Sequence, residues 1–182
     1  SVTGGQVMPE AAVVDHGDTT QFEIVADEGY DVVSVEGCDG SLAGTTYTTG
    51  VIVGACSITP AFALKEYAVT TNVAAGTGSF EPESLTVAHG QNGTLTVTPA
   101  FGFQVDSVTG DACEVAASAS PGEYTVGPIT SACQVDASFS LLSYTVNTAV
   151  SGNGTVSPGT VVVEHGSTCL LYTSPSPRDS RK

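Results

Sequence analysis

The chain has 182 residues, of which 13% are charged, 21 are Gly and none is Trp, and its 19 acidic and 4 basic residues give a formal net charge of −15. A composition poor in Lys, Glu and Arg favours strands and turns over helices. The negative charge excludes nucleic acid and anionic membranes as partners, and no run of 18 apolar residues is present that would insert into a membrane.

An internal repeat organises the chain. Ala12 to Gly37 aligns without a gap on Leu85 to Gly110, and the opening of the same stretch recurs at 161–168. Self-similarity at a fixed period is the signature of a repeat protein. We therefore expect units of about 75 residues: unit one at 1–66, which lacks its first strand, a complete unit two at 67–143, and the start of unit three at 144–168. The chain is then expected to be a fragment of a longer protein.

Each unit is predicted to begin with two short strands. The first starts with a tyrosine and is present at Tyr67–Val73 and Tyr144–Val150, and the second follows a Gly-rich turn and ends at Pro9, Pro82 or Pro158. The Thr and Val residues of these segments are typical of strands, and the glycines between them are typical of tight turns.

A third strand is predicted before a His-Gly pair in every unit. The residues before the pair read AVVD, LTVA and VVVE, and the pairs begin at His16, His89 and His165. A metal-binding or catalytic histidine is one interpretation, but each of these is the only histidine of its unit and has no cysteine beside it. We favour a turn, in which the glycine supplies a left-handed φ.

The strand after this turn alternates apolar and polar residues, as Phe22 and Ile24 show in unit one, and this period of two indicates one buried face. A further turn then places Gly29 or Gly102 before an aromatic residue. This aromatic residue is expected to fill the core of its small sheet. An exposed Tyr30 would instead provide a platform for stacking sugars.

The segments between the two cysteines of each unit, 39–46 and 114–123, are the least regular and differ in length, so unit-specific recognition is expected there. The last strand of each unit, at 57–62 or 134–139, is followed by only three or four residues before the next tyrosine. Linkers this short predict that consecutive units stack or form a semi-rigid rod. No helix is predicted.

Four of the five cysteines fall at matching places in the first two units, as Cys38 and Cys56 and as Cys113 and Cys133. No Cys-x-x-Cys pair and no neighbouring histidine accompanies them, which argues against a zinc site. We predict the disulfides Cys38–Cys56 and Cys113–Cys133, each contributing about 3 kcal/mol to the stability of its unit. Disulfides imply an oxidising compartment, at the cell surface or outside the cell.

Residues 169–182 depart from the repeat. Where a strand is expected after Thr168, the sequence reads CLLYTSPSPRD and contains the fifth cysteine, Cys169. These eleven residues resemble an in-frame translation of a sequencing adapter. We interpret 169–182 as an assembly artefact without structure and exclude it from the prediction of the fold.

The residues that recur at matching places are mostly turn glycines, prolines and aromatic residues. They are Tyr67, Gly78, Pro82, Gly90, Pro99, Gly102, Phe103, Gly110 and Phe139 in unit two, and Gly5, Pro9, Gly17, Gly29, Tyr30, Gly37 and Phe62 in unit one. Their order resembles the divergent InlB B-repeat family, whose members are repeat modules of bacterial secreted and surface proteins. Members more often have Trp where Val35 and Val108 stand, and often lack the paired cysteines. The resemblance implies an all-β fold of tandem compact units, similar to a β-grasp module.

These observations favour a non-catalytic extracellular repeat module that acts as a stalk, a spacer or an adhesion module and meets a protein or glycan ligand at a cell surface. No catalytic residue, cofactor or metal ligand is assigned, since the motifs G-x-S-x-G, HExxH and the P-loop are absent from the sequence. The alternative is a calcium- or carbohydrate-binding module appended to a secreted enzyme. It depends on the acidic residues around the turns of unit one, which are Asp15, Asp18, Asp27, Glu28, Asp31, Glu36 and Asp39.

Overall fold

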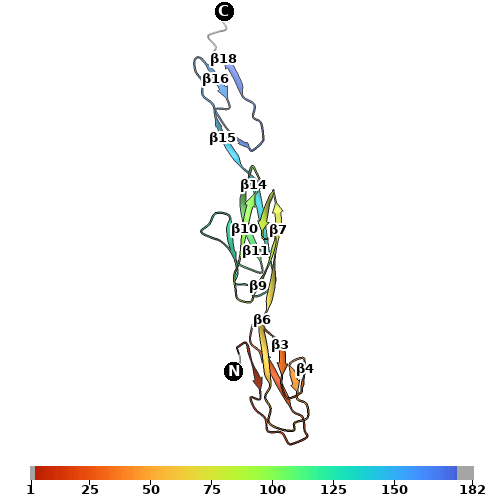
Figure 1. Cartoon of the computed structure of the whole chain (residues 1–182). Helices are drawn as coiled ribbons and strands as arrows, with labels where there is room; N and C mark the ends of the chain where they lie inside the picture. Colours follow the sequence, from red (N-terminus) through yellow and green to blue (C-terminus); the bar gives the residue numbers. More distant parts are fainter. Residues whose placement is uncertain (1–2, 176–182) are drawn as a thin grey trace, which may run out of the picture.

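The computed structural model describes residues 3–175, in which every regular element is a β-strand (Figure 1). The strands form three units that follow one another along an elongated molecule (Figure 1). The all-β fold of small sheets predicted from the composition and the repeat is confirmed. No helix among the described residues is long and apolar enough to cross a membrane.

Unit two consists of two four-stranded sheets, with the strand orders β12-β13-β10-β8 and β11-β14-β7-β9. Within this unit β7 and β14 pair in parallel and the other neighbours pair antiparallel. The strands are β7 Glu66–Ala75, β8 Gly78–Glu81, β9 Ser84–Ala88, β10 Gly93–Pro99, β11 Phe103–Asp111, β12 Val115–Ala117, β13 Glu123–Val126 and β14 Cys133–Leu141.

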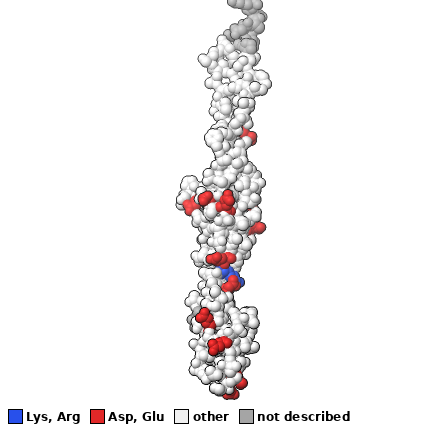
Figure 2. Space-filling view, turned by 45° about the vertical axis from the view of Figure 1, so that its right-hand side comes forward, with Lys and Arg blue, Asp and Glu red and all other residues white. Residues whose placement is uncertain are grey.

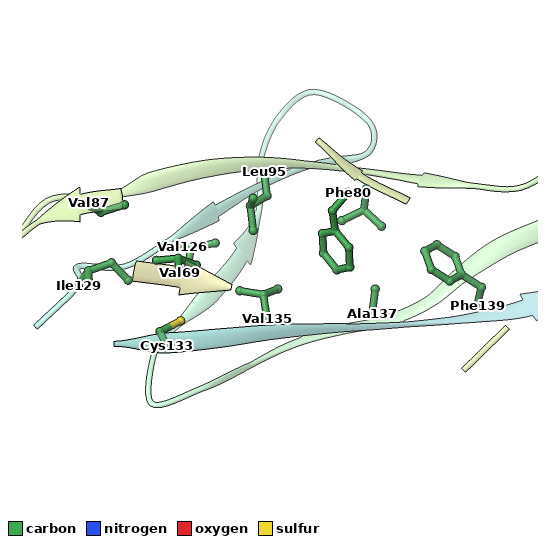
Figure 3. Packing of buried hydrophobic residues seen from close by; sticks show 11 residues of the cluster. Val69, Phe80, Val87, Leu95, Val126, Ile129, Cys133, Val135, Ala137 and Phe139 are labelled. Carbon is green, nitrogen blue, oxygen red and sulfur yellow. The ribbon is translucent and has the colours of Figure 1, made fainter. Parts of the chain in front are cut away.

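The core of unit two is formed by apolar residues of both sheets (Figure 3). Alternate residues of β10 and β14 are buried, so that Leu95, Val97 and Val135 are at most 2% exposed, while the polar residues between them reach solvent. β7 lies between β14 and β9 and contributes Val69, which is 0% exposed. Burial of each such side chain contributes about 1.5–3 kcal/mol, which makes β7 an integral part of the core.

Unit one has a sheet with the order β1-β2-β5-β4 and a separate pair of β3 with β6. Its strands are β1 Gly5–Met8, β2 Gln21–Ala26, β3 Tyr30–Glu36, β4 Ser41–Ala43, β5 Thr46–Thr48 and β6 Thr59–Leu64. Ile24 and Tyr47 are buried. The Tyr47 hydroxyl donates to the carbonyl of Gly37 and accepts from the backbone N–H of Gly40, which ties the β4–β5 hairpin to the end of β3.

The segments between the cysteines are more regular than the sequence predicts. Instead of being irregular throughout, they contain the short strands β4 and β12, which pair with β5 and β13 at the end of each segment. β5 also pairs with β2, and β13 pairs with β10. β5 and β13 are therefore stabilised by ladders with a distant segment. The three residues of β4 and of β12 carry no clear pattern that would predict a strand.

Residues 11–15 of unit one form no strand, although their sequence resembles those of β9 and β17. The prediction of a strand here is wrong. β9 pairs with β7, and β17 pairs with β15. Among the described residues of unit one, no strand takes the place of β7 beside this segment. The segment therefore has no partner for a ladder, and Val13 is fully exposed.

Unit three has two strand pairs, β15–β17 and β16–β18. The strands are β15 Ser143–Asn147, β16 Gly154–Ser157, β17 Thr160–Glu164 and β18 Tyr172–Pro175. β18 lies in the tail for which we expected no structure, so this expectation is wrong for residues 172–175. The edge of β16 accepts β18 in the register in which β8 accepts β10: Pro175 lies opposite Gly154, as Pro99 lies opposite Gly78. The remainder of the tail, 176–182, lies outside the described residues.

Candidate functional site: the unit junctions and a groove in unit one

Each of the first two units contains one disulfide. Cys38 is bonded to Cys56 and Cys113 to Cys133, with Cα–Cα separations of 5.5 and 5.8 Å. These are the pairs that the spacing in the sequence predicts. Cys133 is 5% exposed and belongs to the core of unit two, whereas Cys56 is exposed. The two disulfides therefore share a position in the repeat but have different surroundings.

On the face shown in Figure 2, the acidic side chains lie mainly on units one and two, and residues 144–175 contribute only Glu164. Among residues 3–175, no three or more His, Cys, Asp or Glu side chains lie close enough together to hold a metal ion. Lys65 Nζ lies 3.6 Å from a carboxylate oxygen of Asp31, and both side chains are substantially exposed. An exposed ion pair of this kind contributes little to stability.

The His-Gly pairs form turns, in agreement with the interpretation of the sequence. Gly17, Gly90 and Gly166 have left-handed φ values of +96°, +74° and +76°. In unit two the N–H of Gly90 donates to the carbonyl of Ile129 at 2.7 Å, and Gly17 makes the equivalent bond in unit one. The turns are thus anchored to the segment that leads to the second cysteine.

Two of the histidines also belong to the contacts between units. We define junction one as Gly29, Lys65 and His89. Lys65 is the single residue between β6 and β7. Its N–H donates to the carbonyl of Gly29 in unit one at 2.8 Å, and its carbonyl accepts from the N–H of His89 in unit two at 2.8 Å. Both backbone groups of the linker are therefore held, one by each unit.

Junction two repeats this arrangement with Gly102, Leu142 and His165. Leu142 is the single residue between β14 and β15. Its N–H donates to the carbonyl of Gly102 at 2.8 Å, and its carbonyl accepts from the N–H of His165 at 2.7 Å. The second linker is a leucine instead of a lysine, so the geometry depends on backbone groups and not on the side chain of the linker.

The imidazole rings cover the turn of the preceding unit. A Cβ atom at Gly29 would overlap the ring of His89, and a Cβ atom at Gly102 would overlap the ring of His165. His89 also packs against Tyr67, with ring centroids 5.9 Å apart. Glycine is required in these turns both for its positive φ, +79° at Gly29 and +84° at Gly102, and for the space that the ring occupies.

The ring of His165 has an additional neighbour that His89 lacks. Its centroid lies 4.9 Å from that of Phe101, in an edge-to-face arrangement, and 6.0 Å from that of Tyr144. The Tyr144 hydroxyl is 3.3 Å from Nδ1 of His165. Edge-to-face pairs of this kind contribute about 0.5–1.5 kcal/mol beyond the area that they bury.

Sequence reasoning missed the position of the histidines at the junctions. The available signal was that the His-Gly pair and the glycine-aromatic turn recur together in units joined by very short linkers. With linkers of this length, the end of one unit must meet the start of the next, and the two recurring turns are the residues available to meet.

A groove is present in unit one at the place where β7 lies in unit two. It has a volume of about 960 Å³ and runs between the segments 11–16 and 52–60. Val7, Phe22 and Thr49, from or next to the strands of the β1-β2-β5-β4 sheet, line its floor. The repeat predicts that unit one lacks its first strand, but it does not predict an open groove of this size.

Residues of unit one that correspond to core residues of unit two are less covered. Ile129 is 0% exposed, whereas Ile52, at the equivalent place, is half-buried and lines the groove. Cys133 is 5% exposed, whereas Cys56 is exposed. The groove therefore exposes the side of unit one that β7 covers in unit two.

Comparison with known proteins identifies the repeat. Residues 67–143, the segment defined above as unit two, match the family model of the divergent InlB B-repeat domain. No curated protein and no solved structure matches the chain. The match confirms the resemblance deduced from the turn glycines and strand residues of this segment. Residues 67–143 of this chain are therefore similar to the divergent InlB B-repeat domain.

Proposed function

We propose that the chain is a non-catalytic part of a bacterial surface or secreted protein, in which its units form a stalk or spacer. The divergent InlB B-repeat family suggests a bacterial surface repeat module, and such repeat domains are generally non-catalytic. The two disulfides fit an extracellular setting, because the cytosol keeps most thiols reduced.

The observation that carries this proposal is the repetition of the junction. A flexible linker leaves two domains free to reorient, whereas a one-residue linker with both backbone groups bonded to its neighbours restricts that motion. The same pair of bonds at both junctions gives successive units the same relation, as in other repeat proteins whose units contact only their neighbours. Three units joined by this repeated pair of bonds form an elongated molecule, which is the shape seen in Figure 1.

Gly29→Ala is expected to loosen junction one, because the new methyl group would overlap the ring of His89. Amide exchange at Lys65 and His89 should accelerate about tenfold, which corresponds to about 1.4 kcal/mol. Small-angle X-ray scattering should then show a wider range of molecular lengths. The matched control is Gly44→Ala: Gly44 also has a left-handed φ, +62°, but nothing lies within 4 Å of the position of a Cβ atom there.

Equal exchange rates at Lys65 and His89 in the two variants would contradict the role of the His89 ring in holding the units. An unchanged scattering profile, together with faster exchange, would show that the junction does not set the length of the molecule. In that case the stalk proposal would lose its main support.

A further inference from the structure

The first and last strands of unit two lie side by side in the same sheet. Residues 69–75 of β7 pair in parallel with residues 133–138 of β14. β7 follows unit one after the single residue Lys65, and β14 leads into unit three through the single residue Leu142. Tension along the chain therefore enters unit two at the start of β7 and leaves it at the end of β14.

The parallel pairing determines how this tension acts. In a parallel pair, the start of one strand and the end of the other lie at opposite ends of the ladder. Tension therefore pulls β7 and β14 past each other along their length, in shear, and all hydrogen bonds between them carry the load together. A single hydrogen bond contributes little in net terms, so the resistance of the pair depends on this simultaneous loading.

The buried side chains of the pair prevent a gradual slip. Val69 of β7 and Val135 and Ala137 of β14 are all 0% exposed and face the core (Figure 3). A slip by one residue would turn Val69 towards solvent, because side chains alternate between the two faces of a strand. The alternation is restored only after a slip of two residues, roughly 6.6 Å. The ladder and the packing of Val69 are lost together over this distance, so the pair gives way as a whole.

Neither of the two loaded strands lies at an edge of the sheet. β7 also pairs with β9, and β14 also pairs with β11. The disulfide between Cys113 and Cys133 ties the first residue of β14 to the segment that follows β11. Both strands are therefore held on two sides, and β14 is held by a covalent bond as well.

We propose that β7 and β14 form a mechanical clamp, so that unit two bears tension along the chain without unfolding. The clamp needs only the pairing within unit two. Its use in the cell rests on the stalk proposal, because a stalk that is fixed at one end and pulled at the other is under tension. The stalk proposal concerns the length and stiffness of the molecule, whereas the clamp concerns the force that the molecule withstands.

One side-chain hydrogen bond crosses the clamp on its outer face. Nδ2 of Asn72 in β7 donates to Oδ1 of Asp136 in β14 at 2.7 Å. Nε2 of Gln134 donates to the same oxygen at 3.0 Å, but Gln134 and Asp136 belong to the same strand. Asn72 and Gln134 are both exposed. The two amides are thus a matched pair of donors, of which only Asn72 bridges the strands that tension pulls apart.

The clamp is tested by pulling single molecules of the whole chain in two geometries. In the first geometry, azide-bearing residues that carry the handles replace Ala63 and Ser143, which are exposed and lie just outside β7 and β14. Units one and three then carry no load, and β7 and β14 are pulled in shear. In the second geometry the first handle moves to Thr77, an exposed residue beyond the other end of β7. Both handles then lie at the same end of the pair, so the ladder opens one bond at a time.

The unfolding force of unit two should be at least about twofold lower in the second geometry, because each bond then breaks alone. Equal unfolding forces in the two geometries would overturn the proposal. Reduction of the disulfide should lengthen the unfolding event by about 60–65 Å, because 20 sequence positions of at most about 3.3–3.6 Å each replace a Cα–Cα separation of 5.8 Å. This gain in length assigns the event to unit two.

The matched substitutions locate the resistance within unit two. In the shear geometry, Asn72→Ala should raise the unfolding rate at constant force about three- to tenfold, as expected for the loss of one hydrogen bond. Gln134→Ala should raise this rate less than about twofold, whereas the two variants should unfold at similar rates in denaturant. Equal acceleration of both variants under load would show that the boundary between β7 and β14 does not carry the force, and would overturn the proposal.

The stalk proposal and the clamp fail in different measurements. An unchanged scattering profile of Gly29→Ala, together with faster exchange at junction one, counts against the stalk and leaves the difference between the two pulling geometries in place. Equal unfolding forces in the two geometries count against the clamp, whatever the scattering profile of the chain.

Discussion

Ile129→Ala is expected to destabilise unit two by about 2–5 kcal/mol, the usual cost of truncating a fully buried isoleucine. Ile129 is 0% exposed and belongs to the core cluster that includes Val69 of β7. Ile52→Ala, at the equivalent place in unit one, is expected to cost about 1 kcal/mol, because Ile52 is half-buried and lines an open groove. Amide exchange at increasing denaturant measures the opening free energy of each unit separately.

This pair of substitutions is its own control, since the residue removed and its position in the repeat are the same. Equal losses at Ile129 and Ile52 would show that the groove is closed in solution.

The features of the fold that could be predicted from the sequence are those determined by local chemistry. The alternation of Phe22 and Ile24 predicts a strand with one buried face, and β2 has this pattern, with Ile24 fully buried and Phe22 half-buried. Gly29 and Gly102 were expected in turns that require a positive φ, and both have one. In each case the residue and its immediate neighbours contain the information.

The features that the sequence did not predict depend on a partner elsewhere in the chain. Residues 11–15 have the composition of β9 but no strand beside them, so the same kind of sequence is a strand in one unit and not in the other. β18 forms because β16 has a free edge in the right register. The junction role of His89 depends on Gly29, 60 positions earlier, and no local pattern indicates such a contact.

The cysteine pairs and the groove of unit one also differ in how far they could be predicted from the sequence. The pairing of the cysteines could be inferred because matching spacings in two units leave one economical arrangement. The groove could be inferred only in outline, as a missing strand, because its volume and the exposure of Ile52 and Cys56 depend on how far the remaining strands collapse. They do not collapse fully, since the chain at 11–15 has no ladder to join.

Removal of the disulfide of unit two, by Cys113→Ala together with Cys133→Ala, is expected to cost about 3 kcal/mol from the entropy of the unfolded chain. The same double substitution at Cys38 and Cys56 should cost a similar entropic amount, because the sequence separations are 20 and 18. Unit two should lose more in total, since Cys133 is 5% exposed within the core, whereas Cys56 is exposed. Unit-by-unit amide exchange measures both losses, and a larger loss in unit one would contradict this assignment.

The exposure of Cys56 also predicts the order in which the bonds are reduced. Attack by a thiolate requires access to a sulfur atom, so dithiothreitol under native conditions should open Cys38–Cys56 before Cys113–Cys133. Alkylation followed by mass spectrometry gives the order directly, and reduction of both bonds at one rate would contradict it.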